Sequence, residues 1–332
     1  MILSKTLSWD EDEWRSILHE SIRDAKTLRS VLGLKQDETE WLDKPTFEIF
    51  VPRPFLARIE PRNPKDPLLL QVAPSVQEQT EAAGYTADPL KEGDSMIAPG
   101  VLRKYQGRVL YIVASACPIH CRYCFRRHFP YREHRTASIE PLLKVLNTDS
   151  SIFEVILSGG DPLILPNDQL EKIISEIGMV PNVRSVRIHT RFGVVLPQRI
   201  TPGLLGVLRA ERLKIVVVMH VNHPNEIDEK VQSATNALVT SGVTLLNQSV
   251  LLKGVNDSAR VLEQLSWKLF EIGVLPYYLH LLDKVAGTSH FDLPEQRALS
   301  IYRRLQSRVP GYLAPRLVRE IPDRGAKTIV AF

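Results

Sequence analysis

From about residue 108 onward, short apolar runs alternate with longer amphipathic segments. Six runs have the length and β-branched content of buried strands: 109–114, 153–158, 185–189, 215–220, 243–249 and 276–281. Between them, segments such as 225–241 and 258–272 carry apolar residues at three- and four-residue spacing and end at a glycine. This α/β alternation predicts a parallel sheet with right-handed crossovers. Periodicity alone leaves a doubly wound sheet and a partial barrel equally open.

The N-terminal third has a different pattern. Apolar residues at helical spacing from Trp14 to Leu32 predict one helix, which Gly33 ends. Residues 44–100 are rich in proline and predict an irregular segment that wraps around the rest of the chain. The chain therefore divides into a helical and wrapping segment at 1–100, a core at 101–285 and a C-terminal segment at 286–332.

Composition narrows the class of protein without identifying it. The chain has 332 residues, of which 44% are hydrophobic and 24% charged, as in soluble globular proteins. The net charge of +4 is mild and does not call for a nucleic-acid partner. No apolar run is long enough to span a membrane, and the N-terminus lacks an apolar leader. We therefore expect a cytoplasmic protein that does not bind membranes.

The three cysteines, Cys117, Cys121 and Cys124, lie within eight residues directly after the first predicted strand. Their small, odd number argues against a secreted disulfide framework. Thiolates suit iron–sulfur clusters, zinc or copper. Three thiolates on a four-iron cluster leave one iron open, which can bind the amino and carboxylate groups of a methionine moiety. The alternative is a structural zinc site with His120 or His128 as fourth ligand, although such sites usually pair ligands from two separated knuckles.

Further polar residues stand at the ends of the predicted strands. Ser158, Gly159, Gly160 and Asp161 follow the second strand, and glycine there lets a ligand approach a backbone whose polar groups are free. A plain turn between a strand and a helix would also use glycine. Other candidates at or just past strand ends are His189, His220, Asn222, Gln248 and Asn256. A histidine whose hydrogen bonds are satisfied within the core is the usual alternative for any one of them.

Long, ordered runs of the sequence resemble a known family. The runs are CPIHCRYCFRRHFPY, LSGGDPL, LLNQSVLLKGVND, PYYLHLLDKVAGTSHF and the final AKT, within about residues 45–330. They resemble the radical S-adenosylmethionine enzymes of the lysine 2,3-aminomutase family. The resemblance implies a (β/α)6 partial barrel with N-terminal helical and C-terminal extensions. It also implies L-lysine as substrate, with a [4Fe-4S] cluster, S-adenosylmethionine and pyridoxal 5′-phosphate as cofactors.

The resemblance assigns cofactor roles to residues of this chain. The three cysteines hold the cluster, and the 158–161 loop contacts S-adenosylmethionine. Lys327 matches the lysine to which pyridoxal phosphate is attached, although the glycine run before it is shorter here than in many aminomutases. The phosphate contacts fall on Lys104, Tyr105 and Arg108. For these three residues a solvated basic patch is the alternative.

The same resemblance places the substrate between opposite charges. Arg126 binds the α-carboxylate as a two-pronged fork, and Asp283 pairs with the ε-ammonium. Glu320 stands seven residues before Lys327, where the family often has aspartate. The extra methylene shifts the floor of the pocket while keeping its charge. The alternative is that Asp283 and Glu320 form ordinary ion pairs at the surface.

The run FRRHFPY and the position of Lys327 five residues before the last residue favour one branch of the family. That branch makes (R)-β-lysine for the modification of elongation factor P. Its partners would be elongation factor P, a lysyl-transferase-like ligase and a reductant such as flavodoxin or ferredoxin. Two alternatives remain: an aminomutase serving free β-lysine metabolism, and a non-catalytic iron–sulfur or zinc protein.

Overall fold

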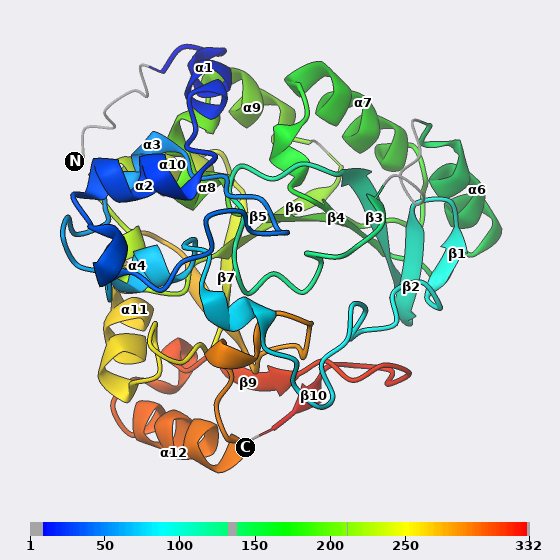
Figure 1. Cartoon of the computed structure of the whole chain (residues 1–332). Coiled ribbons are helices and arrows are strands. Elements are labelled where there is room, and N and C mark those ends of the chain that lie inside the picture. The colour runs from blue at the N-terminus through cyan, green and yellow to red at the C-terminus, as the bar shows by residue number, and fades with distance from the viewer. Residues whose placement is uncertain (1–8, 132–137, 211, 331–332) are drawn as a thin grey trace.

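A computed structural model describes residues 9–131, 138–210 and 212–330 (Figure 1). Residues 1–8, on which the expectation about a leader rests, lie outside the described residues. Ten strands form one sheet, and their order in the sheet is their order in the chain. The strands are β1 (Met96–Ala98), β2 (Val101–Tyr105), β3 (Arg108–Ala114), β4 (Glu154–Gly159), β5 (Ser185–Thr190), β6 (Lys214–His220), β7 (Thr244–Val250), β8 (Leu275–His280), β9 (Arg316–Arg319) and β10 (Thr328–Ile329).

The strand order separates the two architectures that periodicity left open. Strands β3 to β9 run parallel, each beside the next, whereas β1, β2 and β10 pair antiparallel with their neighbours. A doubly wound sheet reverses its strand order at a switch point, and this sheet has no reversal. The predicted partial barrel is therefore confirmed. All six predicted strands match β3 to β8 to within one residue at each end.

Helices surround the outside of the sheet in Figure 1. Those that follow β3 include α6 (Glu140–Thr148), α7 (Asn167–Gly178), α9 (Pro202–Val207), α10 (Glu229–Thr240), α11 (Ala259–Glu271) and α12 (Glu295–Gln306). The predicted helix 225–241 begins later than expected, because Pro224–Glu226 forms a 3-10 turn and Asp228 caps α10 by accepting from the amide of Val231. The apolar faces of these helices pack on the sheet, as Ile174 and Leu238 do in the largest core cluster.

The prediction of a single N-terminal helix is wrong, because the segment forms two helices, α1 (Glu13–His19) and α2 (Ala25–Leu32). Ile22 lies between them and forms a β-bridge with Val51, and Asp24 caps the second helix. Gly33 ends it in the left-handed conformation, with φ of 66°. The wrapping segment is irregular as predicted, with short turns α3 (Arg53–Leu56), α4 (Pro67–Leu70), η1 (Gln36–Glu38) and η2 (Val76–Gln79).

The sheet contains strands from all three segments into which the sequence analysis divided the chain. Strand β1 belongs to the first segment, and β9 and β10 belong to the last. The division at residues 100 and 285 stays a prediction about the chain. None of the helices in the described parts of the chain is both long and apolar enough to cross a bilayer.

Candidate active site

The loop that carries the cysteines follows β3 and rests on the N-terminal wrapping segment. Glu78 accepts hydrogen bonds from Arg122 and from Arg127, at 2.7 and 2.6 Å, and its side chain is buried. The two histidines considered as zinc ligands face backbone carbonyls. His120 Nδ1 lies 2.9 Å from the oxygen of Glu48, and His128 Nε2 lies 3.1 Å from the oxygen of Ala286.

Two of the three thiols, those of Cys117 and Cys124, are buried beside other ionisable groups. Burial raises the pKa of Cys117, and the charges of Cys124 and Cys121 add to the shift. Burial and the charge of Cys121 raise the pKa of Cys124 to about 12. Thiolates at Cys117 and Cys124 therefore need a positively charged centre nearby. Within the described residues, no three His, Cys, Asp or Glu side chains are arranged to hold a single metal ion. Three thiolates on one loop are ligands that a four-iron cluster takes, because each thiolate binds its own iron.

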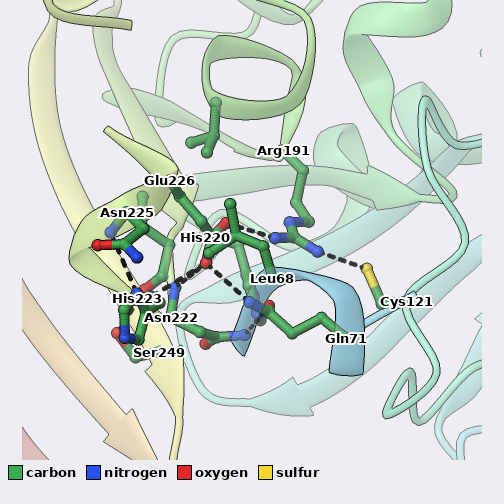
Figure 2. A network of polar contacts seen from close by, with 12 residues as sticks. Leu68, Gln71, Cys121, Arg191, His220, Asn222, His223, Asn225, Glu226 and Ser249 are labelled. Carbon is green, nitrogen blue, oxygen red and sulfur yellow. Dashed lines mark hydrogen bonds and ion pairs between the residues drawn. The ribbon is translucent and has the colours of Figure 1, made fainter. Parts of the chain in front are cut away.

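A buried polar network connects the cysteine loop with the barrel (Figure 2). Arg191, just after β5, donates to the sulfur of Cys121 at 2.8 Å and to Glu226 at 2.6 Å. Glu226 also accepts from the amide of Asn222 at 2.9 Å and from the side chain of Gln71 at 3.2 Å. Sequence reasoning missed Arg191 and Glu226. They lie just past strand ends, which is the signal that singled out their neighbours.

Of the five residues predicted from strand ends, three have partners inside this network. Asn222 donates to Tyr123 at 2.7 Å, and Asn256 donates to the carbonyl of Asn222 at 2.9 Å. The ring of His220 lies 3.2 Å from the Tyr123 hydroxyl. The remaining two are different. Nε2 of His189 is buried without a hydrogen-bond partner in the described structure. The hydrogen bonds found among the described side chains do not include Gln248 on β7.

The two glycines after β4 are required for a reason that the sequence analysis did not give. Gly159 has a φ of 121°, and a Cβ there would lie 2.3 Å from the oxygen of Ala114. A Cβ on Gly160 would lie 2.3 Å from the oxygen of Ala116. The amide of Gly160 donates to Ala114 and that of Asp161 to Ala116, both at 2.8 Å. These amides are therefore not free for a ligand. The glycines let the end of β4 pack against the start of the cysteine loop.

Asp161 has internal partners as well. Its carboxylate accepts from the Thr190 hydroxyl at 2.8 Å, from the amide of Arg191 at 2.7 Å and from the amide of Leu163 at 3.0 Å. Burial raises the pKa of this carboxyl to about 6, against the effect of those hydrogen bonds. Asp161 therefore positions the backbone of Arg191. The hydroxyl of Ser158 accepts from Arg126 at 3.0 Å.

Lys327 lies in a hairpin beside Glu320. Glu320 directly follows β9 and Lys327 directly precedes β10, so the pairing of these strands brings the ammonium and the carboxylate into an ion pair. Lys104 on β2 also pairs with Glu320, at 3.2 Å. Burial opposes ionisation of Glu320, but Lys327 and Lys104 outweigh it and hold its pKa below the ordinary value. A Cβ on Gly325 would meet no atom within 4 Å.

Arg108 and Tyr105 stand next to this pair. The guanidinium of Arg108 lies 4.9 Å from the centre of the Tyr105 ring. Its Nε is buried and has no hydrogen-bond partner among the described residues. Burial raises the pKa of Tyr105, and the charge of Glu320 adds to the shift. A buried cation with an unused donor fits an anionic group such as a phosphate.

The fork of Arg126 is occupied within the chain. Its Nε and Nη2 donate to the two carboxylate oxygens of Glu92 at 2.6 and 2.8 Å. Its Nη1 donates to the hydroxyl of Ser158 and, at 3.1 Å, to the oxygen of Gly159. Sequence reasoning missed Glu92, which lies in the irregular wrapping segment where no periodicity singles it out.

Asp283 follows β8 and faces the same group of charges. Burial raises the pKa of its carboxyl to about 7, and the neighbouring carboxylate of Glu320 adds to the shift. No hydrogen bond to this carboxylate is found in the described chain, in contrast to Glu92 and Glu320. Tyr278 and His280 on β8 also face the site. Lys327 Nζ lies 5.7 Å from the Tyr278 ring, and burial with Lys327 lowers the pKa of His280. The two-residue alternation of this strand could have identified both.

Comparison with known proteins identifies the family of the chain. Residues 105–190, which include all three cysteines, match the family described as a 4Fe-4S single cluster domain. The chain is 47% identical to L-lysine 2,3-aminomutase of Haemophilus influenzae, over 97% of this chain and 96% of that one. It is 41% identical to the enzyme of the same name from Escherichia coli, over 96% and 94%. The identity with that of Buchnera aphidicola is 39%, over 99% and 98%. Identity of this extent over nearly the whole chain shows that the protein is an isomerase belonging to the L-lysine 2,3-aminomutase family.

Proposed function

We propose that the chain is a pyridoxal phosphate-dependent radical S-adenosylmethionine enzyme that converts L-α-lysine into (R)-β-lysine for the modification of elongation factor P. The observation that carries this proposal is the juxtaposition of two groups. Arg126, two residues after Cys124, is linked through Glu92 and Lys104 to Glu320 and Lys327. The loop that carries the cysteines and the amine of Lys327 thus border one group of charged side chains.

The cofactors carry the difficult chemistry. When bound, the cluster and S-adenosylmethionine would supply radical hydrogen-abstraction chemistry, and pyridoxal phosphate would supply the π-system that migration of an amino group requires. The chain would hold the cluster through Cys117, Cys121 and Cys124. The unpartnered Nε2 of His189 and the side chain of Gln248 are the groups we assign to S-adenosylmethionine.

The residues around Lys327 fit pyridoxal phosphate. Lys327 offers a primary amine beside an aromatic ring, that of Tyr278. Arg108 has an unused buried donor, and Lys104 carries a second positive charge on the adjacent strand. Together they provide the amine and the cations that an aldehyde bearing a phosphate requires. Glu320 keeps Lys327 in position until the cofactor arrives.

The substrate would lie between Arg126 and Asp283. Lysine has a carboxylate at one end and an ammonium at the other, and burying either one unpaired is costly. The carboxylate of Asp283 has no hydrogen-bond partner in the described structure, so it is free to accept the ε-ammonium. Two anchors of opposite charge at a fixed separation select for chain length. Ornithine is one methylene shorter and should not reach both.

The elongation factor P branch is supported by the run FRRHFPY. Tyr131 in this run donates to the oxygen of Gly159 at 2.7 Å, and the Phe129 ring lies 5.7 Å from the guanidinium of Arg126. The residues that favour the branch therefore form a wall of the substrate site. The proposed partners, elongation factor P and its lysyl-transferase-like ligase, act in the cytoplasm, which is where the proposal places this chain.

The decisive experiment is anaerobic incubation of the reconstituted protein with L-lysine, S-adenosylmethionine and a reductant, followed by chiral analysis. We expect (R)-β-lysine, with flavodoxin or ferredoxin able to replace a chemical reductant. Adding elongation factor P and the ligase should then transfer the product. Formation of β-lysine that the ligase does not use would instead favour free β-lysine metabolism.

Lys327→Ala serves as the control for pyridoxal phosphate. Lys327 is not among the residues proposed to bind the cluster, so the variant should retain iron. It should lose both the borohydride-trapped adduct and the migration of the amino group. An adduct trapped on another lysine would show that the assignment is wrong. A fully loaded wild-type protein that makes no β-lysine would contradict the proposed function itself.

A further inference from the structure

Glu92 reaches into the site from an exposed turn. Its neighbours Lys91, Gly93 and Asp94 are exposed, whereas Glu92 is 1% exposed. Lys91 has a φ of 49°, the left-handed region that non-glycine residues occupy at a cost. Leu90 next to it is also buried, and Ser95 beyond it accepts from the amide of Arg103 at 2.8 Å, so the turn is anchored on both sides. Between these anchors, in residues 91–94, the side chain of Glu92 is the buried one.

The carboxylate of Glu92 neutralises two of the cations assigned to ligands. It forms two hydrogen bonds to Arg126 and an ion pair with Lys104 at 2.9 Å. Burial alone would raise its pKa, but Arg126 and Lys104 outweigh burial and hold the pKa at about 2. Glu92 is thus ionised at every physiological pH. It occupies the fork in the way that an α-carboxylate would.

The donors of Arg126 cannot serve both carboxylates. A guanidinium has five N–H groups, and four of them are used by Glu92, Ser158 and Gly159. One donor remains, so a second carboxylate cannot bind as a fork while Glu92 is present. Two carboxylates side by side would also repel each other, and the repulsion is stronger in a buried site than in water. Exchange of one carboxylate for another leaves the net charge of the site unchanged.

We propose that, in the ligand-free protein, the carboxylate of Glu92 occupies the binding position of the α-carboxylate of the amino-acid substrate. It keeps Arg126 and Lys104 in place in the ligand-free protein and leaves with its turn when the amino acid binds. This inference rests on the proposed function. Glu92 is then a specificity-determining residue. When Glu92 leaves, Arg126 and Lys104 lose their carboxylate partner, and only a ligand that has a carboxylate replaces it.

The proposal predicts a selective change in affinity. The apparent Kd of a ligand rises as the competent fraction of the protein falls, so removing the competitor tightens binding. In the pyridoxal phosphate-loaded protein without S-adenosylmethionine, Glu92→Gln should lower the Kd of L-lysine by about tenfold. The Kd of 1,5-diaminopentane, which is lysine without its carboxylate, should change by less than about twofold. Equilibrium dialysis measures both.

Hydrogen exchange of the wild type provides a second readout that does not depend on the variant folding. Amides in residues 89–96 should exchange faster when L-lysine is bound than when 1,5-diaminopentane is bound. Glu78→Gln is the matched control, because Glu78 is another buried carboxylate shared by two cations. It should not separate the two ligands.

Each remaining outcome overturns the inference. If Glu92→Gln weakens L-lysine binding, or shifts both ligands together, Glu92 is a fixed partner of Arg126. Unchanged exchange of residues 89–96 on lysine binding leads to the same conclusion. In either case the wild type still binds lysine and the proposed function stands. A wild type that binds neither ligand despite a trapped adduct on Lys327 would instead refute the proposed substrate.

Discussion

The carboxyl of Asp283 titrates near neutral pH, unlike the two other carboxyls of the site. Burial and Glu320 raise the pKa of Asp283 to about 7. Paired cations keep Glu92 and Glu320 ionised. Because the pKa of Asp283 is raised, its neutral form predominates below pH 7 in the ligand-free protein. The carboxylate, which binds an ammonium, predominates above it.

Lysine binding should therefore strengthen as the pH rises. With that pKa of about 7, the Kd of L-lysine should fall by about fivefold between pH 6 and 7 and by less than about twofold between pH 7 and 8. Asp283→Asn should remove this dependence and reduce kcat/KM by roughly 10²-fold or more, because a buried ammonium loses its partner. Norleucine, which lacks the ammonium, is the control. If it reacts as well as lysine in the wild type, Asp283 does not select the substrate.

The cysteines allow a prediction about metal content. Cys117→Ala, Cys121→Ala and Cys124→Ala should each abolish four-iron reconstitution and S-adenosylmethionine cleavage, because each thiolate binds a different iron. Iron analysis and electron paramagnetic resonance measure the cluster. A single variant that reconstitutes four irons and stays active would show that its cysteine is not a ligand.

Single residues differed in how far the sequence could identify them. The spacing of the cysteines is local, so their role follows from a few adjacent positions. The partner of Arg126 is Glu92, 34 residues away in a segment without periodicity. No local pattern records such a pair. The same holds for Glu226, which contacts Arg191 from 35 residues away.

At the scale of elements, the contact between the end of β4 and the start of the cysteine loop depends on two glycines. A Cβ at Gly159 or Gly160 would stand 2.3 Å from a carbonyl oxygen, and backbone cannot yield as a flexible side chain does. Gly159→Ala should destabilise the protein by about 1–3 kcal/mol and lower iron occupancy. Urea unfolding and iron analysis measure the two effects.

Gly206→Ala is the matched control for this change. Gly206 lies in α9, and a Cβ there would meet nothing within 4 Å. Alanine favours the helix, so this variant should be as stable as the wild type or more so by about 0.5–1 kcal/mol. Equal stability of Gly159→Ala and Gly206→Ala would mean that the two strand ends can separate at no cost.

Short apolar runs identified strands β3 to β8 well, and their ends were predicted to within one residue. Strand β4, for example, is buried on both faces, so nearly all of its residues are apolar or small. The break between α1 and α2 escaped prediction because helical spacing continues across it, while the bridge from Ile22 to Val51 is a tertiary contact. Strand β9 has four residues, too few for alternation to distinguish it.

At the scale of the whole molecule, the barrel is open, and side chains span its opening. The sheet begins at β1 and ends at β10, and these two strands do not pair. Lys104 on β2 reaches Glu320 after β9, and Thr86 forms a β-bridge with Val285. Ion pairs and one isolated bridge thus take the place of the backbone ladder that would close a complete barrel.

Lys104→Gln should therefore weaken the whole protein. It leaves Glu92 and Glu320 with one cation fewer in a buried site, which costs about 3 kcal/mol by analogy with other broken buried pairs. Urea unfolding of the cofactor-free protein measures the loss. Lys172→Gln is the control, because its pair with Glu176 is 3.9 Å long with the lysine exposed, and it should change stability by less than about 0.5 kcal/mol. A similar small change for both would show that the opening is not held by these charges.

The positions of the contact partners along the chain have a consequence for the order of folding. Arg122 in the cysteine loop meets Glu78 across 44 positions, whereas Lys104 meets Glu320 across 216 positions. Closing a longer loop costs more entropy, so distant pairs form later. During refolding, amides near the cysteines should gain protection from pulsed hydrogen exchange before those of β9 and β10. The loop that carries the cysteines would then fold before Lys327 comes into contact with Glu320.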